Sequence, residues 1–224
     1  MKKLDDIGFY TLSDSRSKTA SAETPLSRCE ILLTGRCNFH CPYCRRVGGK
    51  DADAQAVAAT LVRWASYKLK NVRFSGGEPT LYPFLKDMVK MARGLDIERV
   101  AVSTNGSART ELYQSLIKSG ANDFSVSLDA CCSEDGDLMA GGIKGSWDRV
   151  VENIRYLSSM VYTTVGIVLT EENVSRASEI IQFAASLGVS DIRVIPAAQD
   201  GQKLSRIRVD HTILERLPIL KYRV

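Results

Sequence analysis

Short β-rich segments alternate with helical segments along most of this 224-residue chain, and this alternation restricts the possible folds more than any other feature. Six segments are rich in β-branched and apolar residues, and the five segments between them have helical periodicity. The expected strands cover residues 29–34, 71–76, 98–104, 123–130, 162–170 and 191–196. The expected helices cover residues 53–68, 83–94, 108–120, 147–160 and 174–188.

Each connection between successive strands is long enough for a crossover helix, so the strands are expected to be parallel. A parallel sheet is covered on its faces, which suits the apolar strands of this chain. The repeat spacing predicts an α/β fold, a partial (β/α)6 TIM-like barrel with parallel strands. A flat doubly wound sheet remains the alternative. In both folds the functional residues belong at the carboxyl ends of the strands.

The barrel is expected to span residues 28–199 as one domain. Residues 1–27 are polar and rich in serine and threonine, and are expected to form a flexible lead-in. Residues 200–224 are expected to be a C-terminal segment that is either truncated or closes the mouth of the barrel.

The composition argues against several classes of protein. The net charge is only +4 and the basic residues are spread along the chain, so no nucleic-acid partner is expected. No run approaches the roughly 18 apolar residues that a membrane span needs. The first residues lack the apolar core of a secretory signal. These observations predict a cytoplasmic protein without a membrane association.

Three cysteines, Cys37, Cys41 and Cys44, lie close together after the first expected strand, with C-x3-C-x2-C spacing. In a reducing cytoplasm such a set indicates metal binding or catalysis rather than disulfides. Structural zinc needs four protein ligands, and neither His40 nor Cys29 is well placed to be the fourth. A [4Fe–4S] cluster held by three cysteines leaves one iron open to a small molecule. A cluster is therefore favoured, with zinc and inert thiols as alternatives.

Polar or small residues also end the other expected strands. The segment SGGEP places Gly76, Gly77 and Glu78 after the second strand. Glycine permits close backbone approach, and a carboxylate suits an ammonium group. A plain turn with Glu78 near a helix N-terminus is the alternative. The segments STNGS, SLDA and IPAAQ, which begin at residues 103, 127 and 195, end later strands on the same rim.

Together, these motifs resemble those of a known enzyme family. The C-x3-C-x2-C spacing with Tyr43 before the last cysteine, followed by GGEP at residues 76–79, is similar to the radical S-adenosylmethionine (radical SAM) enzymes. The resemblance covers residues 29–199. It is greatest to the subgroup that contains the molybdenum-cofactor cyclase and peptide-modifying maturases.

The resemblance implies a role for each matching residue. The three cysteines would hold a [4Fe–4S] cluster, whose open iron would bind the amino and carboxylate groups of S-adenosylmethionine. Glu78 and the Gly76–Gly77 backbone would contact the methionine ammonium group. Other residues would lie where relatives contact the cofactor, with strand-end capping or plain core packing as alternatives. These residues are Tyr43, Ser103, Asn105, Ser127, Asp129 and Ile195 within the segment 194–196.

The resemblance also implies the chemistry and the partners. One electron from the reduced cluster would cleave S-adenosylmethionine to a 5′-deoxyadenosyl radical, which abstracts hydrogen from a substrate. The cluster would be oxygen-sensitive, and flavodoxin or ferredoxin would be the electron donor. The substrate is not identified, and a small metabolite is slightly favoured over a peptide. A zinc-binding or iron–sulfur electron-transfer module without radical catalysis is the alternative.

This sequence also departs from the subgroup pattern. No cysteine follows Cys132, so the second cluster of the cyclase, and with it that activity, is not expected. Cys131 and Cys132 are interpreted as two buried small residues, with a hydrogen donor near the substrate as the alternative. Lys144, Arg155 and Arg193 are expected to be surface charges rather than contacts for an anionic substrate.

Overall fold

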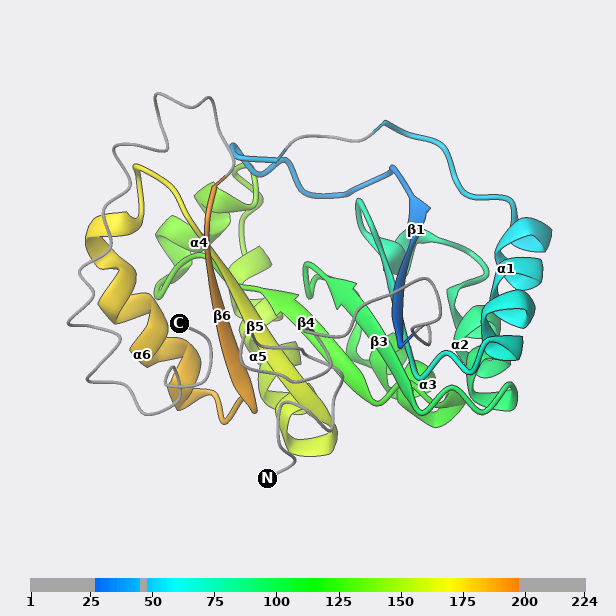
Figure 1. The fold of residues 1–224 in the computed structure, drawn as a ribbon. Helices are drawn as coiled ribbons and strands as arrows, with labels where there is room; N and C mark the ends of the chain where they lie inside the picture. Colours follow the sequence, from blue (N-terminus) through cyan, green and yellow to red (C-terminus); the bar gives the residue numbers. More distant parts are fainter. Residues whose placement is uncertain (1–26, 45–47, 198–224) are drawn as a thin grey trace, which may run out of the picture.

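The computed structural model of this chain describes residues 27–44 and 48–197. Its six strands are β1 (Arg28–Thr34), β2 (Asn71–Gly76), β3 (Arg99–Thr104), β4 (Asp123–Ser127), β5 (Tyr162–Leu169) and β6 (Asp191–Pro196) (Figure 1). Its α-helices are α1 (Ala54–Ser66), α2 (Leu85–Gly94), α3 (Thr110–Ser119), α4 (Ser133–Met139), α5 (Ser146–Met160) and α6 (Ala177–Ser186). Two short 3-10 helices, η3 (Pro79–Leu81) and η4 (Val174–Arg176), complete the set of described helices.

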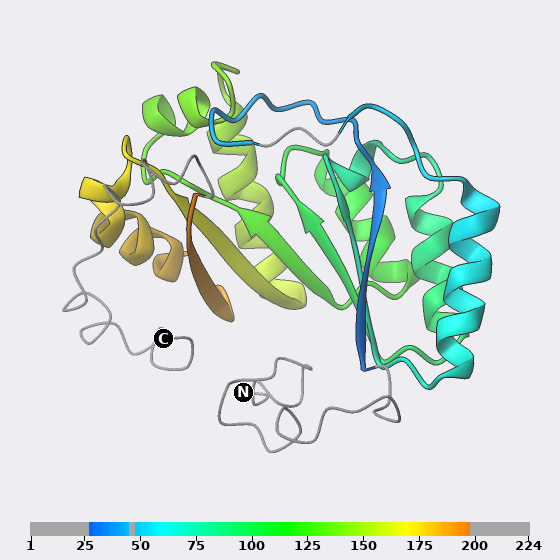
Figure 2. The ribbon, with the colours of Figure 1, turned by 45° about the horizontal axis from the view of Figure 1, so that its top comes forward.

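The strands form one parallel sheet in the order β1-β2-β3-β4-β5-β6. A doubly wound sheet reverses its strand order at a switch point, whereas this order never reverses. Because crossovers between parallel strands are right-handed, an unbroken order places the crossover helices on one side of the sheet. Figures 1 and 2 show the helices along the outer side of a curved sheet, with β1 and β6 at its two edges. The partial barrel is confirmed, and the doubly wound alternative is wrong.

The hydrophobic core lies between the sheet and the helices. Alternate strand residues point outward, and Phe74 and Phe124 on this face are 0% exposed. The helices bury their apolar stripes against these residues. The ring of Tyr113 from α3, for example, meets Phe124 edge-on at a centroid distance of 5.8 Å. This face supplies most of the apolar burial of the described fold.

The inner face of the sheet is polar. Ser75, Ser103 and Ser125 point inward from three adjacent strands, and Gly166 lies on the inner face of β5. A closed barrel fills this space with layers of branched apolar side chains. Small residues at these positions leave room inside the sheet, near the carboxyl ends of its strands.

Three details of the expected order differ in the structure. The fourth strand ends at Ser127 rather than at residue 130, and the last helix starts with η4. Helix α4 was not expected, because its seven residues are too few to show a helical period. The expected lead-in, apart from Ser27, and the segment 200–224 lie outside the described residues.

No helix in the described ranges is both long enough and apolar enough to cross a bilayer. The cytoplasmic location stays a prediction.

Replacing Phe124 with alanine tests the outer core. Removing this fully buried ring leaves a cavity against Tyr113, so we expect the free energy of unfolding to fall by about 3–5 kcal/mol. Urea-induced unfolding followed by circular dichroism measures the change. Val62→Ala, at a side chain that is 48% exposed on α1, is the matched control, with an expected change within about 0.5 kcal/mol. Equal effects of the two substitutions would contradict this packing.

Candidate functional site

A cavity of about 290 Å³ opens at the carboxyl ends of the strands. The loop that follows β1 runs across these strand ends toward α4 (Figure 1), and side chains of this loop line the cavity. All the predicted site residues except Glu78 line this cavity. They are Cys37, Cys41, Tyr43, Cys44, Gly76, Gly77, Ser103, Asn105, Ser127, Asp129 and Ile195. The expectation that strand ends far apart in sequence share one rim is therefore met.

The three cysteine thiols are free and lie on one short loop. A turn closed by the Cys44 N–H donating to the Cys41 carbonyl at 3.0 Å brings the last two together. Cys37 Sγ accepts from the Phe39 N–H at 3.4 Å. Burial raises the pKa of Cys37, and raises the pKa of Cys41 to about 11, so both are thiols at neutral pH until a metal displaces the proton.

This donor set fits an iron–sulfur cluster better than a single metal ion. Among the described residues, no three cysteine, histidine or carboxylate groups converge on one ion position. In a [4Fe–4S] cluster each thiolate binds a different iron, so the sulfur atoms do not share one centre. His40 does not line the cavity, and its N–H donates to the Ala140 carbonyl at 2.9 Å. Cys29 packs against the hydrophobic core, away from the loop.

Gly76 and Gly77 allow the end of β2 to run directly against the start of the cysteine loop. Gly76 has a φ of +142°, and a Cβ there would lie 2.3 Å from the Thr34 carbonyl oxygen. A Cβ on Gly77 would lie 2.2 Å from the Arg36 carbonyl oxygen. The N–H groups of Gly77 and Glu78 donate to those two carbonyls at 2.7 and 2.8 Å. The predicted close backbone approach is confirmed.

Glu78 differs from its expected role. Its side chain is 0% exposed and does not line the cavity. The carboxylate accepts hydrogen bonds from Thr80 N–H and Oγ1 at 3.0 and 2.6 Å, and from Thr104 Oγ1 at 2.8 Å. The Asn105 N–H donates to its other oxygen at 2.6 Å. Since these donors surround it, Glu78 joins the ends of β2 and β3 instead of facing a ligand, and burial raises its pKa.

Asn105 connects the hydrogen-bonded network around Glu78 to the cysteine loop. Its Nδ2 donates to Asn38 Oδ1 at 2.9 Å and lies 3.9 Å from Cys37 Sγ. Its Oδ1 accepts from the Ser107 N–H at 3.0 Å. The buried Glu78 carboxylate therefore positions the first cysteine of the motif through Asn105.

Tyr43 and Asp129 connect the other end of the cysteine loop to the sheet. The Tyr43 hydroxyl donates to Asp129 Oδ2, and the Val168 N–H donates to Asp129 Oδ1 at 2.6 Å. Burial raises the pKa of Asp129 to about 6, against the opposing effect of these two donors. The end of the loop is thereby held against the ends of β4 and β5.

Apolar residues that the sequence did not single out form one wall of the cavity. Phe39, Met139, Trp147 and Val150 line it, and all but Phe39 come from α4 and α5. The one feature of the sequence that relates to this wall is Gly136 in α4, where a Cβ would lie 2.0 Å from the Trp147 ring. A single glycine, with no helical pattern of apolar residues around it, does not predict such a contact.

The three basic residues considered as anion contacts lie in different environments in the structure. Lys144 and Arg155 are exposed, as expected. Arg193 lines the cavity, so its interpretation as a surface charge is wrong. It occupies an inward-facing position of β6, which the strand pattern alone does not distinguish from an outward one.

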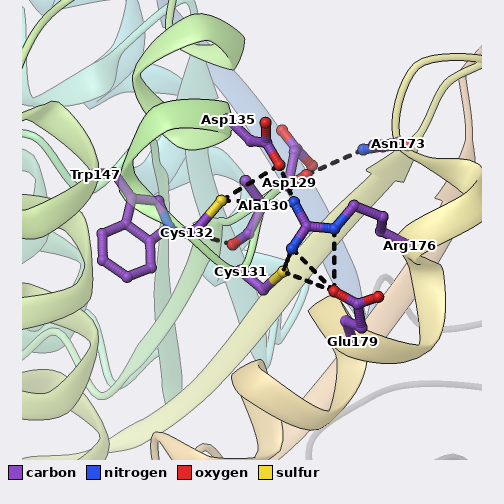
Figure 3. Close-up of polar contacts among 9 residues, drawn as sticks. All are labelled: Asp129, Ala130, Cys131, Cys132, Asp135, Trp147, Asn173, Arg176 and Glu179. Carbon is purple, nitrogen blue, oxygen red and sulfur yellow. Dashed lines mark hydrogen bonds and ion pairs between the residues drawn. The ribbon is translucent and has the colours of Figure 1, made fainter.

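Cys131 and Cys132 lie outside the cavity, beside Arg176 (Figure 3). The Arg176 guanidinium donates to the two sulfur atoms at 3.0 and 3.5 Å. Glu179 accepts from the same guanidinium at 2.9 Å, and Asp135 forms a further ion pair with it. Both thiols are partly exposed, so their interpretation as buried residues is wrong. Their position does not support a hydrogen donor at the cavity either.

Asp129→Asn tests the burial of the Asp129 carboxyl. The pKa of Asp129 is raised in the folded protein, so the unfolded chain loses this proton at a lower pH than the folded protein does. Folding therefore becomes less favourable as the pH rises between the two pKa values. Relative to the variant, the cluster-free wild type should lose about 3 kcal/mol of unfolding free energy between about pH 4 and pH 7.5. Urea unfolding at several pH values measures this. A stability difference that does not change with pH would contradict it.

Comparisons with known proteins agree with this geometry. A model of the radical SAM superfamily matches residues 31–184. Probable GTP 3′,8-cyclases of Metallosphaera sedula and Saccharolobus solfataricus are 26% and 29% identical over 178 residues. The alignments cover 76% of this chain but only 56% and 57% of the cyclases. The chain thus spans little more than half the length of these relatives.

Two solved structures share the fold. Streptococcus suis SuiB bound to S-adenosylmethionine superposes with a TM-score of 0.69 at 18% identity, over 86% of this chain and 46% of SuiB. The protein anSMEcpe with bound AdoMet and a Cp18Cys peptide gives 0.67 at 15% identity, over 85% of this chain and 57% of that one. Radical SAM enzymes use a [4Fe–4S] cluster and S-adenosylmethionine. Because the superfamily model matches more than half of the chain and includes both the cysteine loop and GGEP, this protein belongs to the radical SAM superfamily.

Proposed function

We propose that this protein is an enzyme that holds one [4Fe–4S] cluster on Cys37, Cys41 and Cys44 and cleaves S-adenosylmethionine reductively. The observation that supports this most is the meeting of three free thiols and the Gly76–Gly77 backbone at one cavity. When bound, the cluster and S-adenosylmethionine supply a 5′-deoxyadenosyl radical that abstracts hydrogen from the substrate.

Different residues around the cavity would bind different parts of the cofactor. The backbone of Gly76 and Gly77 would contact the methionine ammonium group, since the Glu78 carboxylate does not reach the cavity. Ser103, Ser127 and Asp129 would hold polar groups of the cofactor, and Asn105 would orient the cysteine loop. Tyr43 and Ile195 would flank the adenine. Each of these residues except Glu78 lines the cavity, which is the support for these roles.

Two further features suit radical chemistry. The apolar wall of Phe39, Met139 and Trp147 would keep water from a reactive intermediate. Cys44 is exposed at the mouth of the cavity, which gives an electron donor a short approach to the cluster. Radical SAM enzymes need a reductant, and we propose a flavodoxin or a ferredoxin for this role.

A small metabolite is the substrate class that we favour over a peptide. The relatives at 26% and 29% identity are named for GTP, a small molecule. SuiB, whose structure with the precursor peptide SuiA is known, shares only 20% identity with this chain. The described cavity also lies inside the sheet, where a compact substrate would fit below the cofactor.

Anaerobic reconstitution with iron and sulfide tests the proposed activity. We expect bound iron with acid-labile sulfide, and 5′-deoxyadenosine when dithionite and S-adenosylmethionine are added. Cys41→Ser should abolish 5′-deoxyadenosine because one iron loses its thiolate. Cys29→Ser, at a thiol that packs against the core instead of the loop, is the matched control and should retain the activity. Tightly bound zinc without sulfide, and no 5′-deoxyadenosine, would favour the zinc-binding alternative.

Replacing both Cys131 and Cys132 with serine tests whether these thiols take part in the reaction. Since neither lines the cavity, we expect the double variant to form 5′-deoxyadenosine at nearly the wild-type rate. The assay is the same, with the iron content measured beside it. A large loss of 5′-deoxyadenosine at unchanged iron content would show that the pair acts in catalysis.

A further inference from the structure

Arg36 lies directly before the first cysteine of the loop and contacts the turn that follows β2 at two points. Its carbonyl accepts from the Glu78 N–H at 2.8 Å, and its Nη2 donates to the Leu81 carbonyl at 2.7 Å. Leu81 ends η3, so these two contacts hold the segment 78–81 at both ends. One residue thereby connects this turn with Cys37.

The Arg36 side chain is in turn held by Asp51, which follows the three cysteines in the sequence. Arg36 Nε and Nη2 donate to the two carboxylate oxygens at 2.9 and 2.8 Å, which makes a two-pronged ion pair. Thr34 Oγ1 donates to Asp51 Oδ1 at 2.6 Å and accepts from the Arg36 N–H at 3.0 Å. The hydrogen bonds from Arg36 and Thr34 lower the pKa of Asp51, so the carboxylate is ionised at neutral pH.

The backbone around Asp51 is itself fixed against the start of the cysteine loop. The Gly35 N–H donates to the Lys50 carbonyl at 2.9 Å, and the Ala52 N–H donates to the Leu33 carbonyl at 2.8 Å. The planar guanidinium of arginine matches both oxygens of a carboxylate in only one orientation. A carboxylate on this fixed segment therefore restricts the position of the arginine that it binds.

The ion pair between Arg36 and Asp51 is expected to contribute little to the stability of the fold. The two side chains are 46% and 34% exposed, and ion pairs in contact with water add little to the free energy of unfolding. Its effect is therefore local, on the orientation of Arg36 between the first cysteine and the turn after β2. This separation allows a positioning role to be measured apart from a structural one.

We propose that Asp51 is a positioning residue for the binding of S-adenosylmethionine and acts through Arg36. The backbone of Gly76 and Gly77 runs directly against the carbonyls of Thr34 and Arg36. By fixing Arg36, Asp51 sets the position of this backbone relative to the first cysteine. A ligand that contacts both at once binds less tightly when either is displaced. The inference rests on the proposed function, in which the cofactor contacts both the cluster and this backbone.

Asp51→Asn tests this role, because asparagine keeps the shape of the side chain but cannot form the two-pronged ion pair. In isothermal titration calorimetry of the anaerobically reconstituted protein, S-adenosylmethionine should bind about 10-fold more weakly, since charged hydrogen bonds are lost. Bound iron, and the midpoint of urea unfolding of the cluster-free protein, should stay close to the wild-type values. Glu98→Gln, which removes the exposed ion pair between Lys70 and Glu98, is the matched control and should leave the affinity unchanged.

A second variant covers the case in which Asp51→Asn does not fold. Arg36→Lys keeps the charge but loses the two-pronged geometry, so the affinity should also fall, and the double variant should bind no more weakly than Arg36→Lys alone. Unchanged affinity in both single variants would overturn the inference. A fall in bound iron or in the unfolding midpoint that matches the loss of affinity would show a structural role and would overturn it too. Weaker binding in the variants, with no 5′-deoxyadenosine from the wild type, would instead refute only the proposed function.

Discussion

The buried carboxylate of Glu78 is the group on which the arrangement of the site depends. It accepts hydrogen bonds from Thr80, Thr104 and the Asn105 backbone, and so joins the ends of β2 and β3. Burying a carboxylate is unfavourable unless donors surround it, and here they do. Asn105, fixed in this way, reaches Cys37 and Asn38 in the cysteine loop. An interaction inside the protein thus determines where the first thiol lies at the surface of the cavity.

The outer face of the sheet stabilises the fold, and the inner face lines the cavity. The outer face packs Phe74, Phe124 and their neighbours against the helices and supplies the apolar burial that stabilises the fold. The inner face can therefore carry serines, glycine and arginines that contribute little to folding and leave space for ligands.

The cysteine loop is held at both ends and covered from one side. Asn105 contacts its beginning, and the hydrogen bond between Tyr43 and Asp129 fixes its end. Helix α4 meets its middle, where the His40 N–H donates to the Ala140 carbonyl. A loop positioned by three separate strand ends and one helix keeps its thiols in place before a cluster binds, which lowers the ordering cost of binding.

The amino-acid sequence alone predicts the order of strands and helices, the parallel sheet, the cysteine loop and the rim of polar strand ends. These features follow from local periodicity and from the spacing of a few residue types. The three-dimensional structure was needed to show that the Glu78 side chain is buried away from the cavity and that Arg193 faces the cavity. It was also needed to show that α4 supplies part of an apolar wall and that Cys131 and Cys132 lie outside the cavity. The reason is physical: a period of two shows that strand residues alternate, but the register and curvature of the whole sheet decide which side is the inside.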